Sequence, residues 1–357
     1  MLCILCDLPL NAQDTVSHVQ RQQVMFWNVE NAFWPEEDPE TDDDEFTPEG
    51  TRHWTRGRLR QKLTQLTRVI LAAGGGRAPM LVGLAEVEGD SVMDYWTRHT
   101  SLWDQHYRYV VTHGPDQRGI QTALLYQPFD FRLISAEGHR VVMPDGVKPT
   151  RDVLHAAGRL VNGDTLDVLV CHLPSQLGGA KQSQPGRDAA HRTVMHVADS
   201  LVGVRRCPRV IVMGDMNDTP SARRCWWGRG FCNLMLPLQR ELKRKPGCYA
   251  SHKYQGEWGW LDQFIIDSIH NSEFIIHDSI HNSEFIIHDS IHNSEFIIHN
   301  WSPRTRVGNA RAFALPFMLT ADEVHLGHRP RRSYYGYRYE GGLSDHLPIL
   351  LDLDICY

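Results

Sequence analysis

The sequence predicts an α/β fold in which mixed β-sheets are covered by helices, and three observations support this. Seven short apolar runs have the bulky and β-branched character of strands, and two longer segments between them repeat at helical spacing. Several strand runs are apolar on both faces, which is typical of sheets buried beneath helices. Polar residues end some runs and begin others, so they can share one rim only if the strands run in opposite directions.

The elements follow one another along the whole chain. The predicted helix at 58–73 carries Leu59, Leu63 and Leu66 at helical spacing and stops at the glycines that follow Ala73. A second helix is predicted at 188–202 from the same rhythm of apolar residues. The predicted strands are 24–27, 80–85, 121–126, 166–171, 209–213, 264–266 and 347–353.

Composition limits the class of protein. The 357 residues contain 37 Lys and Arg against 43 Asp and Glu, a formal net charge of −6, and 41% are hydrophobic. This mixture argues against wholesale disorder. No apolar run reaches the roughly 18 residues that a membrane-spanning helix needs. Mild acidity argues against a protein that coats nucleic acid by bulk charge, but it allows an enzyme that contacts a few phosphates.

The domain organisation is predicted to be simple. Residues 1–20 are interpreted as an eroded signal peptide or a disordered tail, and residues 21–357 as a single domain. An eroded signal peptide would imply export to the periplasm or the medium. If residues 1–20 are instead a disordered tail, we expect a cytoplasmic protein. The 11-residue unit DSIHNSEFIIH occurs three times in residues 267–299. We favour a slippage insertion without a role over a metal site built from its histidines.

Nine polar residues lie at the ends of the predicted strands. Asn28, Glu30, Glu86, His172, Asp215 and Asn217 follow strand runs, whereas Asp262, Asp345 and His346 precede them. Because strand side chains alternate, we expect Asn28 with Glu30, and Asp215 with Asn217, to point to the same side. Gathered on one rim, the carboxylates would repel one another unless a cation joined them.

This set of residue types favours attack on a phosphodiester by water. Oxygen-rich ligands without thiolates suit Mg²⁺ or Mn²⁺, with Ca²⁺ as an alternative. The two histidines and the amides add donors for a phosphate. Each residue alone has a simpler explanation: Glu86 as a turn carboxylate, Asp215 to Asn217 as an Asx turn, His172 as a core histidine, and Asp345 with His346 as a turn cap.

The motifs around these residues resemble the endonuclease/exonuclease/phosphatase superfamily. They are Phe26 to Asn31, Leu84 to Val87, Cys171 to Ser175, Gly214 to Asp218, Trp260 to Gln263, and Leu343 to Pro348, in that order along the chain. The resemblance implies the four-layer α/β sandwich of the deoxyribonuclease type, with two mixed β-sheets flanked by helices. The tail from Ser333 to His346 further resembles bacterial members, many of which are exported.

The resemblance also implies roles. Glu86, with Glu30 and Asp345 nearby, would hold the metal, and Asn28 would bind near the metal and substrate. His346, oriented by Asp262, would contact the scissile phosphate, and His172 would donate to a phosphate oxygen. Asp215 would handle the proton of the attacking water or of the leaving group, and Asn217 would position it. Arg118 lies where the family often has a site-facing arginine, and a solvated surface residue is an equal alternative. Arg187 also fits the family's pattern, and a structural role is the equal alternative to a catalytic one.

The leading prediction is therefore a divalent-metal-dependent phosphodiesterase, a nuclease acting on nucleic acid as endonuclease or exonuclease, with no obligate protein partner. One alternative is a phosphatase or phospholipase-type enzyme acting on small phosphoesters or lipid headgroups, and another is an inactive binding module. Basic residues between Arg52 and Lys62 could meet a phosphate backbone or be merely solvated. The pair Trp226-Trp227 would suit stacking on bases or anchoring at a lipid interface. The repeat begins five residues after Asp262, and whether it disturbs the site is open.

Overall fold

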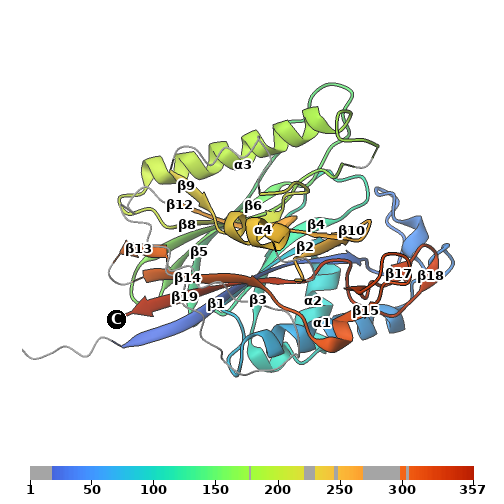
Figure 1. The fold of residues 1–357 in the computed structure, drawn as a ribbon, viewed down its shortest axis with the longest axis horizontal. Helices are drawn as coiled ribbons and strands as arrows, with labels where there is room; N and C mark the ends of the chain where they lie inside the picture. Colours follow the sequence, from blue (N-terminus) through green and yellow to red (C-terminus); the bar gives the residue numbers. More distant parts are fainter. Residues whose placement is uncertain (1–17, 177, 221–229, 245–247, 268–297, 303–304) are drawn as a thin grey trace, which may run out of the picture.

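The protein is built from four stacked layers, two β-sheets with helices on both outer faces (Figure 1). The computed structural model describes residues 18–176, 178–220, 230–244, 248–267, 298–302 and 305–357. In Figure 1, α3 (Gln184–Val204) covers one sheet from above, whereas α1 (Arg56–Ala73) and α2 (Gly89–His99) cover the other from below. This arrangement confirms the predicted four-layer sandwich.

The first sheet has seven strands, and β1 (Val19–Ala32) lies at its centre. β1 pairs parallel with β2 and antiparallel with β19, so the sheet is mixed. The strand order is β13 (Ile298–Ser302), β14 (Thr305–Ala312), β19 (Ile349–Cys356), β1, β2 (Leu81–Val87), β4 (Gln121–Tyr126) and β3 (Arg108–Val111).

The second sheet has six strands and is also mixed, because β7 and β8 are parallel whereas β8 and β12 are antiparallel. Its order is β5 (Phe131–His139), β6 (Val153–Leu160), β7 (Thr165–His172), β8 (Val210–Asp215), β12 (Asp262–Asp267) and β9 (Phe231–Asn233). Helix α4 (Met235–Arg244) follows β9.

Short elements complete the fold around these two sheets. In the part of the chain that the structure describes, three two-stranded hairpins and three short 3₁₀ helices lie in the connections. They are β10 (His252–Tyr254) with β11 (Glu257–Gly259), β15 (Leu319–Ala321) with β16 (His328–Pro330), β17 (Tyr334–Tyr335) with β18 (Arg338–Tyr339), and the turns Asp44–Phe46, Trp103–Gln105 and Pro316–Met318.

Three apolar clusters fill the spaces between the four layers. Alternate residues of β1 point to different clusters: Val24 and Phe26 pack between the sheets, whereas Met25 and Trp27 pack against α1 and α2. The third cluster joins α3 to the second sheet. Strands buried on both faces in this way explain the continuous apolar runs in the sequence. The helix predicted from Arg58 begins at Arg56, because the Thr55 side chain caps it by accepting from the Arg58 amide.

Several predictions fall outside the described residues. Residues 1–17, Trp226-Trp227 and residues 268–297 of the repeat are among them, so the signal peptide and the role of the repeat stay predictions. The limits of a single domain at 21–357 also stay a prediction. No helix in the described part of the chain combines the length and the apolar character that crossing a bilayer would require.

Candidate active site

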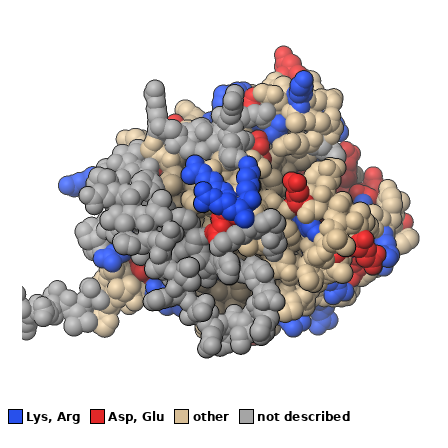
Figure 2. All heavy atoms as spheres, viewed as in Figure 1, with Lys and Arg blue, Asp and Glu red and all other residues tan. Residues whose placement is uncertain are grey.

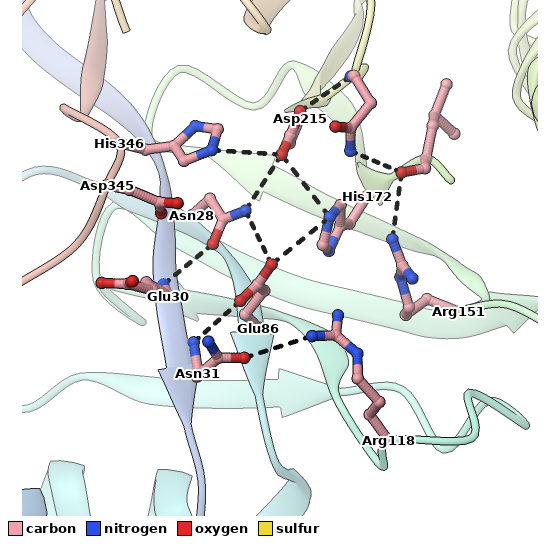
Figure 3. A network of polar contacts seen from close by, with 12 residues as sticks. Asn28, Glu30, Asn31, Glu86, Arg118, Arg151, His172, Asp215, Asp345 and His346 are labelled. Carbon is pink, nitrogen blue, oxygen red and sulfur yellow. Dashed lines mark hydrogen bonds and ion pairs between the residues drawn. The ribbon is translucent and has the colours of Figure 1, made fainter. Parts of the chain in front are cut away.

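The polar ends of four strands, two from each sheet, meet at one edge of the sandwich (Figure 3). Asn28 on β1 connects them, because its amide Nδ2 donates to Glu86 Oε1 at 3.3 Å and to Asp215 Oδ2 at 3.1 Å. Glu86 lies on β2, Asp215 ends β8 and His172 ends β7. The predicted common rim is therefore present, and the antiparallel β12 and β19 bring Asp262 and His346 to it from the opposite direction.

His346 is held as a charged imidazole by two carboxylates. Its Nδ1 lies 2.7 Å from Asp262 Oδ2, and its Nε2 lies 3.8 Å from Asp215 Oδ2. Burial alone would lower the pKa of His346, but the attraction of Asp262 and Asp215 outweighs burial and raises the pKa well above its usual value. The imidazole is therefore protonated at neutral pH and can donate to a phosphate oxygen.

Asp215 lies at the centre of the site with a raised pKa. The side chain is 1% exposed, and burial raises its pKa to about 6, although the neighbouring His346 acts in the opposite direction. A carboxyl group with a pKa close to neutrality is suited to accept and return a proton. The backbone amide of Asn217 donates to Asp215 Oδ1 at 2.9 Å, so the expected Asx turn is present and holds the carboxylate in place.

Asn217 itself faces a different partner from Asp215. Its backbone has a φ of 49°, in the left-handed region, and its Nδ2 donates to the Leu173 carbonyl at 2.8 Å. The predicted alternation that would place Asn217 on the same side as Asp215 is interrupted by this turn. Asn217 therefore supports Asp215 through the backbone and ties it to the residue that follows His172.

His172 is uncharged, in contrast to His346. Its Nε2 lies 3.6 Å from Asp215 Oδ2 and 3.8 Å from Glu86 Oε1. Burial, reinforced by the nearby Arg151 and Arg118, lowers its pKa well below the usual value. His172 is thus neutral and offers a phosphate one N–H donor, whereas the protonated ring of His346 carries a proton on both nitrogens.

Glu86 is held by neutral donors. Its φ of 65° turns the backbone at the end of β2, and the Asn31 amide donates to Glu86 Oε2 at 2.9 Å. Within the described part of the chain, Glu86 forms no ion pair with a lysine or arginine. A carboxylate fixed by neutral donors keeps its charge available for a cation.

Glu30 and Asp345 instead share one arginine that sequence reasoning missed. Arg332 Nε lies 2.9 Å from Glu30 Oε1, and its Nη2 lies 2.8 Å from Asp345 Oδ2. The Ser333 amide donates to the other Glu30 oxygen at 2.9 Å. Figure 3 shows the Glu30 carboxylate directed away from Glu86. Positive φ angles at Glu30 and Asn31 interrupt β1, so Glu30 does not share the surroundings of Asn28 as regular alternation predicted.

A buried lysine supports Glu30 from beneath. Lys62 of α1 is 2% exposed, and its Nζ donates to Ser333 Oγ at 2.6 Å and to the Leu343 carbonyl. Burial lowers the pKa of Lys62 to about 8 against the attraction of Glu30, and burial together with Asp345 raises the pKa of Glu30 to about 7. No local pattern could have placed Arg332 or Lys62 beside Glu30, because both reach it through contacts made by tertiary folding.

The two predicted arginines have different surroundings. Arg118 is exposed, and its Nη1 donates to Asn31 Oδ1 at 3.4 Å beside Glu86, so it faces the site (Figure 3). Arg187 is 1% exposed and binds Asp218 at 3.0 Å and the Ala180 carbonyl at 2.9 Å. These contacts give Arg187 a structural part in joining α3 to the loop after β8.

The basic stretch from Arg52 to Lys62 is largely committed to the protein itself. Arg52 pairs with Glu45, and Arg56 pairs with Glu36. Arg58 donates to two backbone carbonyls and lies over the Tyr339 ring. Lys62 is buried, so four cations of this basic stretch are already occupied by contacts within the chain.

Comparison with known proteins agrees with this architecture. Residues 23–309 match the model of the Endonuclease/Exonuclease/phosphatase family. No curated protein matches the sequence. Three similar solved structures illustrate the shared fold.

The first is D. rerio TDP2 complexed with a single strand DNA product, with 13% identity and a TM-score of 0.53, covering 93% of this chain and 98% of that one. The second is the human Nocturnin catalytic domain with bound sulfate, with 15% identity and a TM-score of 0.53, covering 95% and 97%. The third is a family protein from Bacteroides thetaiotaomicron, with 11% identity and a TM-score of 0.55, covering 95% and 99%. The family model spans most of the chain, and the chain therefore belongs to the endonuclease/exonuclease/phosphatase family.

Proposed function

We propose that this protein is a divalent-metal-dependent phosphodiesterase that cleaves nucleic acid by the attack of water on a phosphate. The observation that carries the proposal is the buried series Asp262, His346 and Asp215, in which two carboxylates flank a protonated imidazole. Such an imidazole stabilises the negative charge that grows on a phosphate, while the neighbouring carboxyl group exchanges a proton near neutral pH.

The donor set supports a bound divalent cation beside Glu86. Glu86 supplies carboxylate oxygens of the kind that Mg²⁺ or Mn²⁺ prefers, and Ca²⁺ also fits. Asn28 turns its Nδ2 toward Glu86, and its Oδ1 accepts from the Glu30 amide at 3.0 Å, so Asn28 positions the Glu86 carboxylate beside the metal position. Glu30 and Asp345 already have a cation in Arg332, so we place them around the metal position rather than as its main ligands. When bound, the metal would polarise the phosphate and lower the pKa of a coordinated water.

Among the described residues, two other groups of side chains have ligand atoms close enough to hold an ion. They are His252 with Asp345 and His346, and Asp215 with Asp262 and His346. Both groups contain His346, whose protonated ring has no free lone pair for a metal. We therefore assign their proximity to the charge pairing of His346 and assign the metal to Glu86.

The remaining residues orient the substrate. Neutral His172 can donate to a phosphate oxygen, and Arg118 is placed at the exposed side of Glu86 to neutralise one. Asn28 bridges Glu86 and Asp215, so it fixes the distance between the metal position and the carboxyl group that exchanges a proton. The fold shared with a TDP2 structure that holds a DNA product supports nucleic acid as the substrate class.

The test is hydrolysis of bis(p-nitrophenyl) phosphate and of p-nitrophenyl phosphate, with Mg²⁺ or Mn²⁺ and with EDTA. We expect metal-dependent cleavage of the diester, loss of that cleavage in His346→Ala, and its retention in His196→Ala. His196 is an exposed histidine on α3, which makes it a matched control. Cleavage of the monoester alone would favour a phosphatase. A folded protein that cleaves neither these compounds nor DNA or RNA would contradict the proposal.

A further inference from the structure

The outer face of α4 carries a cluster of basic side chains. Arg240, Lys243 and Arg244 are the exposed residues of this helix, so every fully exposed position on it is basic. Residues three and four positions apart lie on the same helix face. Figure 2 shows a group of Lys and Arg side chains near the centre of the visible face, where Figure 1 places α4. We call these three residues the α4 basic face.

The charges of the α4 basic face are not compensated within the described residues. None of the three side chains forms a hydrogen bond or an ion pair there, in contrast to Arg52 and Arg56 near α1. Glu241 is the single acidic residue of α4 and is half-buried. The helix dipole favours cations in the last turn, which accounts for Lys243 and Arg244 but not for Arg240 one turn earlier. Three like charges so close together repel one another and favour a polyanionic partner.

The helix is joined to the chain segment that leads into the active site. Gln239 Oε1 of α4 accepts from the Trp260 amide at 3.4 Å, and Trp260 stands two residues before Asp262, which orients His346. The Leu261 carbonyl in turn accepts from the Met216 amide at 2.8 Å, next to Asp215. Figure 1 shows α4 in front of the sheets, between β9 and β10. The helix that carries the basic face is therefore attached to the segment that leads into Asp262.

We propose that the α4 basic face binds the phosphate backbone of a nucleic acid strand on one side of the phosphate that is cleaved. This inference rests on the proposed function and extends it, because it requires a substrate with several phosphates. The apolar residues Met235 and Leu238 of α4 are buried and Leu242 is half-buried, so the helix offers no exposed apolar side chain to a membrane. The face thus favours a polynucleotide over a lipid surface.

The test compares two triple variants that each remove three positive charges. Arg240→Gln, Lys243→Gln and Arg244→Gln together neutralise the α4 basic face. The control combines Arg132→Gln, Arg159→Gln and Arg306→Gln, which are exposed strand residues at the other end of the sandwich. Glutamine keeps the helix propensity of the originals, and thermal unfolding verifies that each variant is folded.

The expected result separates long from short substrates. The α4 variant should lose about tenfold or more in kcat/KM on a labelled single-stranded oligonucleotide. The slope of log kcat/KM against log salt concentration should become shallower by about 2, because each of the three lost phosphate contacts contributes about 0.7 to that slope. Its kcat/KM on bis(p-nitrophenyl) phosphate should match that of the wild type. The control variant should resemble the wild type on both substrates. Equal oligonucleotide cleavage by the α4 variant and the wild type would overturn the inference.

A binding measurement keeps this test independent of turnover. The fluorescence anisotropy of the same oligonucleotide in EDTA reports binding without cleavage, and we expect weaker, less salt-sensitive binding by the α4 variant alone. If the wild type cleaves no phosphodiester, the proposed function fails while the anisotropy still decides the role of the face. Unchanged oligonucleotide binding by the α4 variant would refute the proposal. This holds whether or not the variant also loses binding to phosphatidylcholine vesicles that contain phosphatidylserine.

Discussion

Replacing Asp262 with asparagine would remove one negative charge from beside His346 while changing the shape of the side chain very little. Asp262 is 0% exposed, and its Oδ2 lies 2.7 Å from His346 Nδ1. Its other oxygen has no hydrogen-bond partner among the described residues, so His346 is the main partner of this carboxylate. The substitution should therefore act chiefly through His346.

The magnitude follows from the charge pair. Two unit charges about 4 Å apart in surroundings with an effective dielectric constant of about 20 attract each other by about 4 kcal/mol. Since each 1.36 kcal/mol is a factor of ten in rate, losing this attraction would lower kcat/KM by up to about 1,000-fold. Burial, no longer opposed by Asp262, would then lower the pKa of His346.

The assay is the pH profile of kcat/KM on bis(p-nitrophenyl) phosphate at saturating Mg²⁺. A lower pKa means that the protonated imidazole is lost at a lower pH, so the alkaline limb should move toward acid in Asp262→Asn. Asp164→Asn is the control, because Asp164 is also buried but lies between β6 and β7 at the far end of the sandwich. Activity within about threefold of the wild type, with an unmoved alkaline limb, would refute the role of this pair.

Three further predictions concern the metal, the stability and the repeat. Glu86→Gln should raise the Mg²⁺ concentration for half-maximal activity by at least about tenfold, because the amide keeps an acceptor for Asn31 but loses the charge, and an unchanged metal titration would contradict this. Asp167→Asn should lower the free energy of unfolding in urea at pH 7 by about 1 kcal/mol, because it removes the charge of a buried carboxylate that a half-exposed Arg205 binds through two nitrogens. Burial raises the pKa of Asp167, but the contact with Arg205 outweighs burial and lowers it. The stability that the variant loses should therefore shrink as the pH falls through this lowered pKa, and a loss that stays constant in acid would contradict the prediction. Deleting residues 278–299 should leave diester hydrolysis within about twofold of the wild type, and a large loss would show that the repeat acts on the site.

The last prediction follows from the position of β12. Asp262 begins this strand opposite Asp215, whereas Asp267, the first residue of the repeat, ends it and accepts from the Val210 amide at 2.6 Å. The repeat therefore departs from the end of β12 that is remote from His346. The contact between Asp262 and His346 is intact in the structure, so the insertion need not disturb the reacting groups.

The sequence alone was enough to predict the layers and the residues of the rim. Strand and helix periodicity are local properties, so the apolar runs around Phe26, Val168 and Val212 mark buried strands without knowledge of their neighbours. A polar residue at the end of such a run must lie at an edge of the sheet. This is why Glu86, His172 and Asp215 were identified before any contact between them was known.

Only the tertiary structure decided which charges remain available. Glu30 and Arg332 stand 302 positions apart in the sequence, yet their pairing gives Glu30 surroundings different from those of Glu86. The same applies to the cations. Arg52, Arg56 and Arg58 near α1 are paired with Glu45, Glu36 and backbone carbonyls, whereas the described residues offer no such partners to the basic side chains of α4. Local patterns report where a charge lies along an element, but its partner is set by chain segments that meet only when the sheets stack.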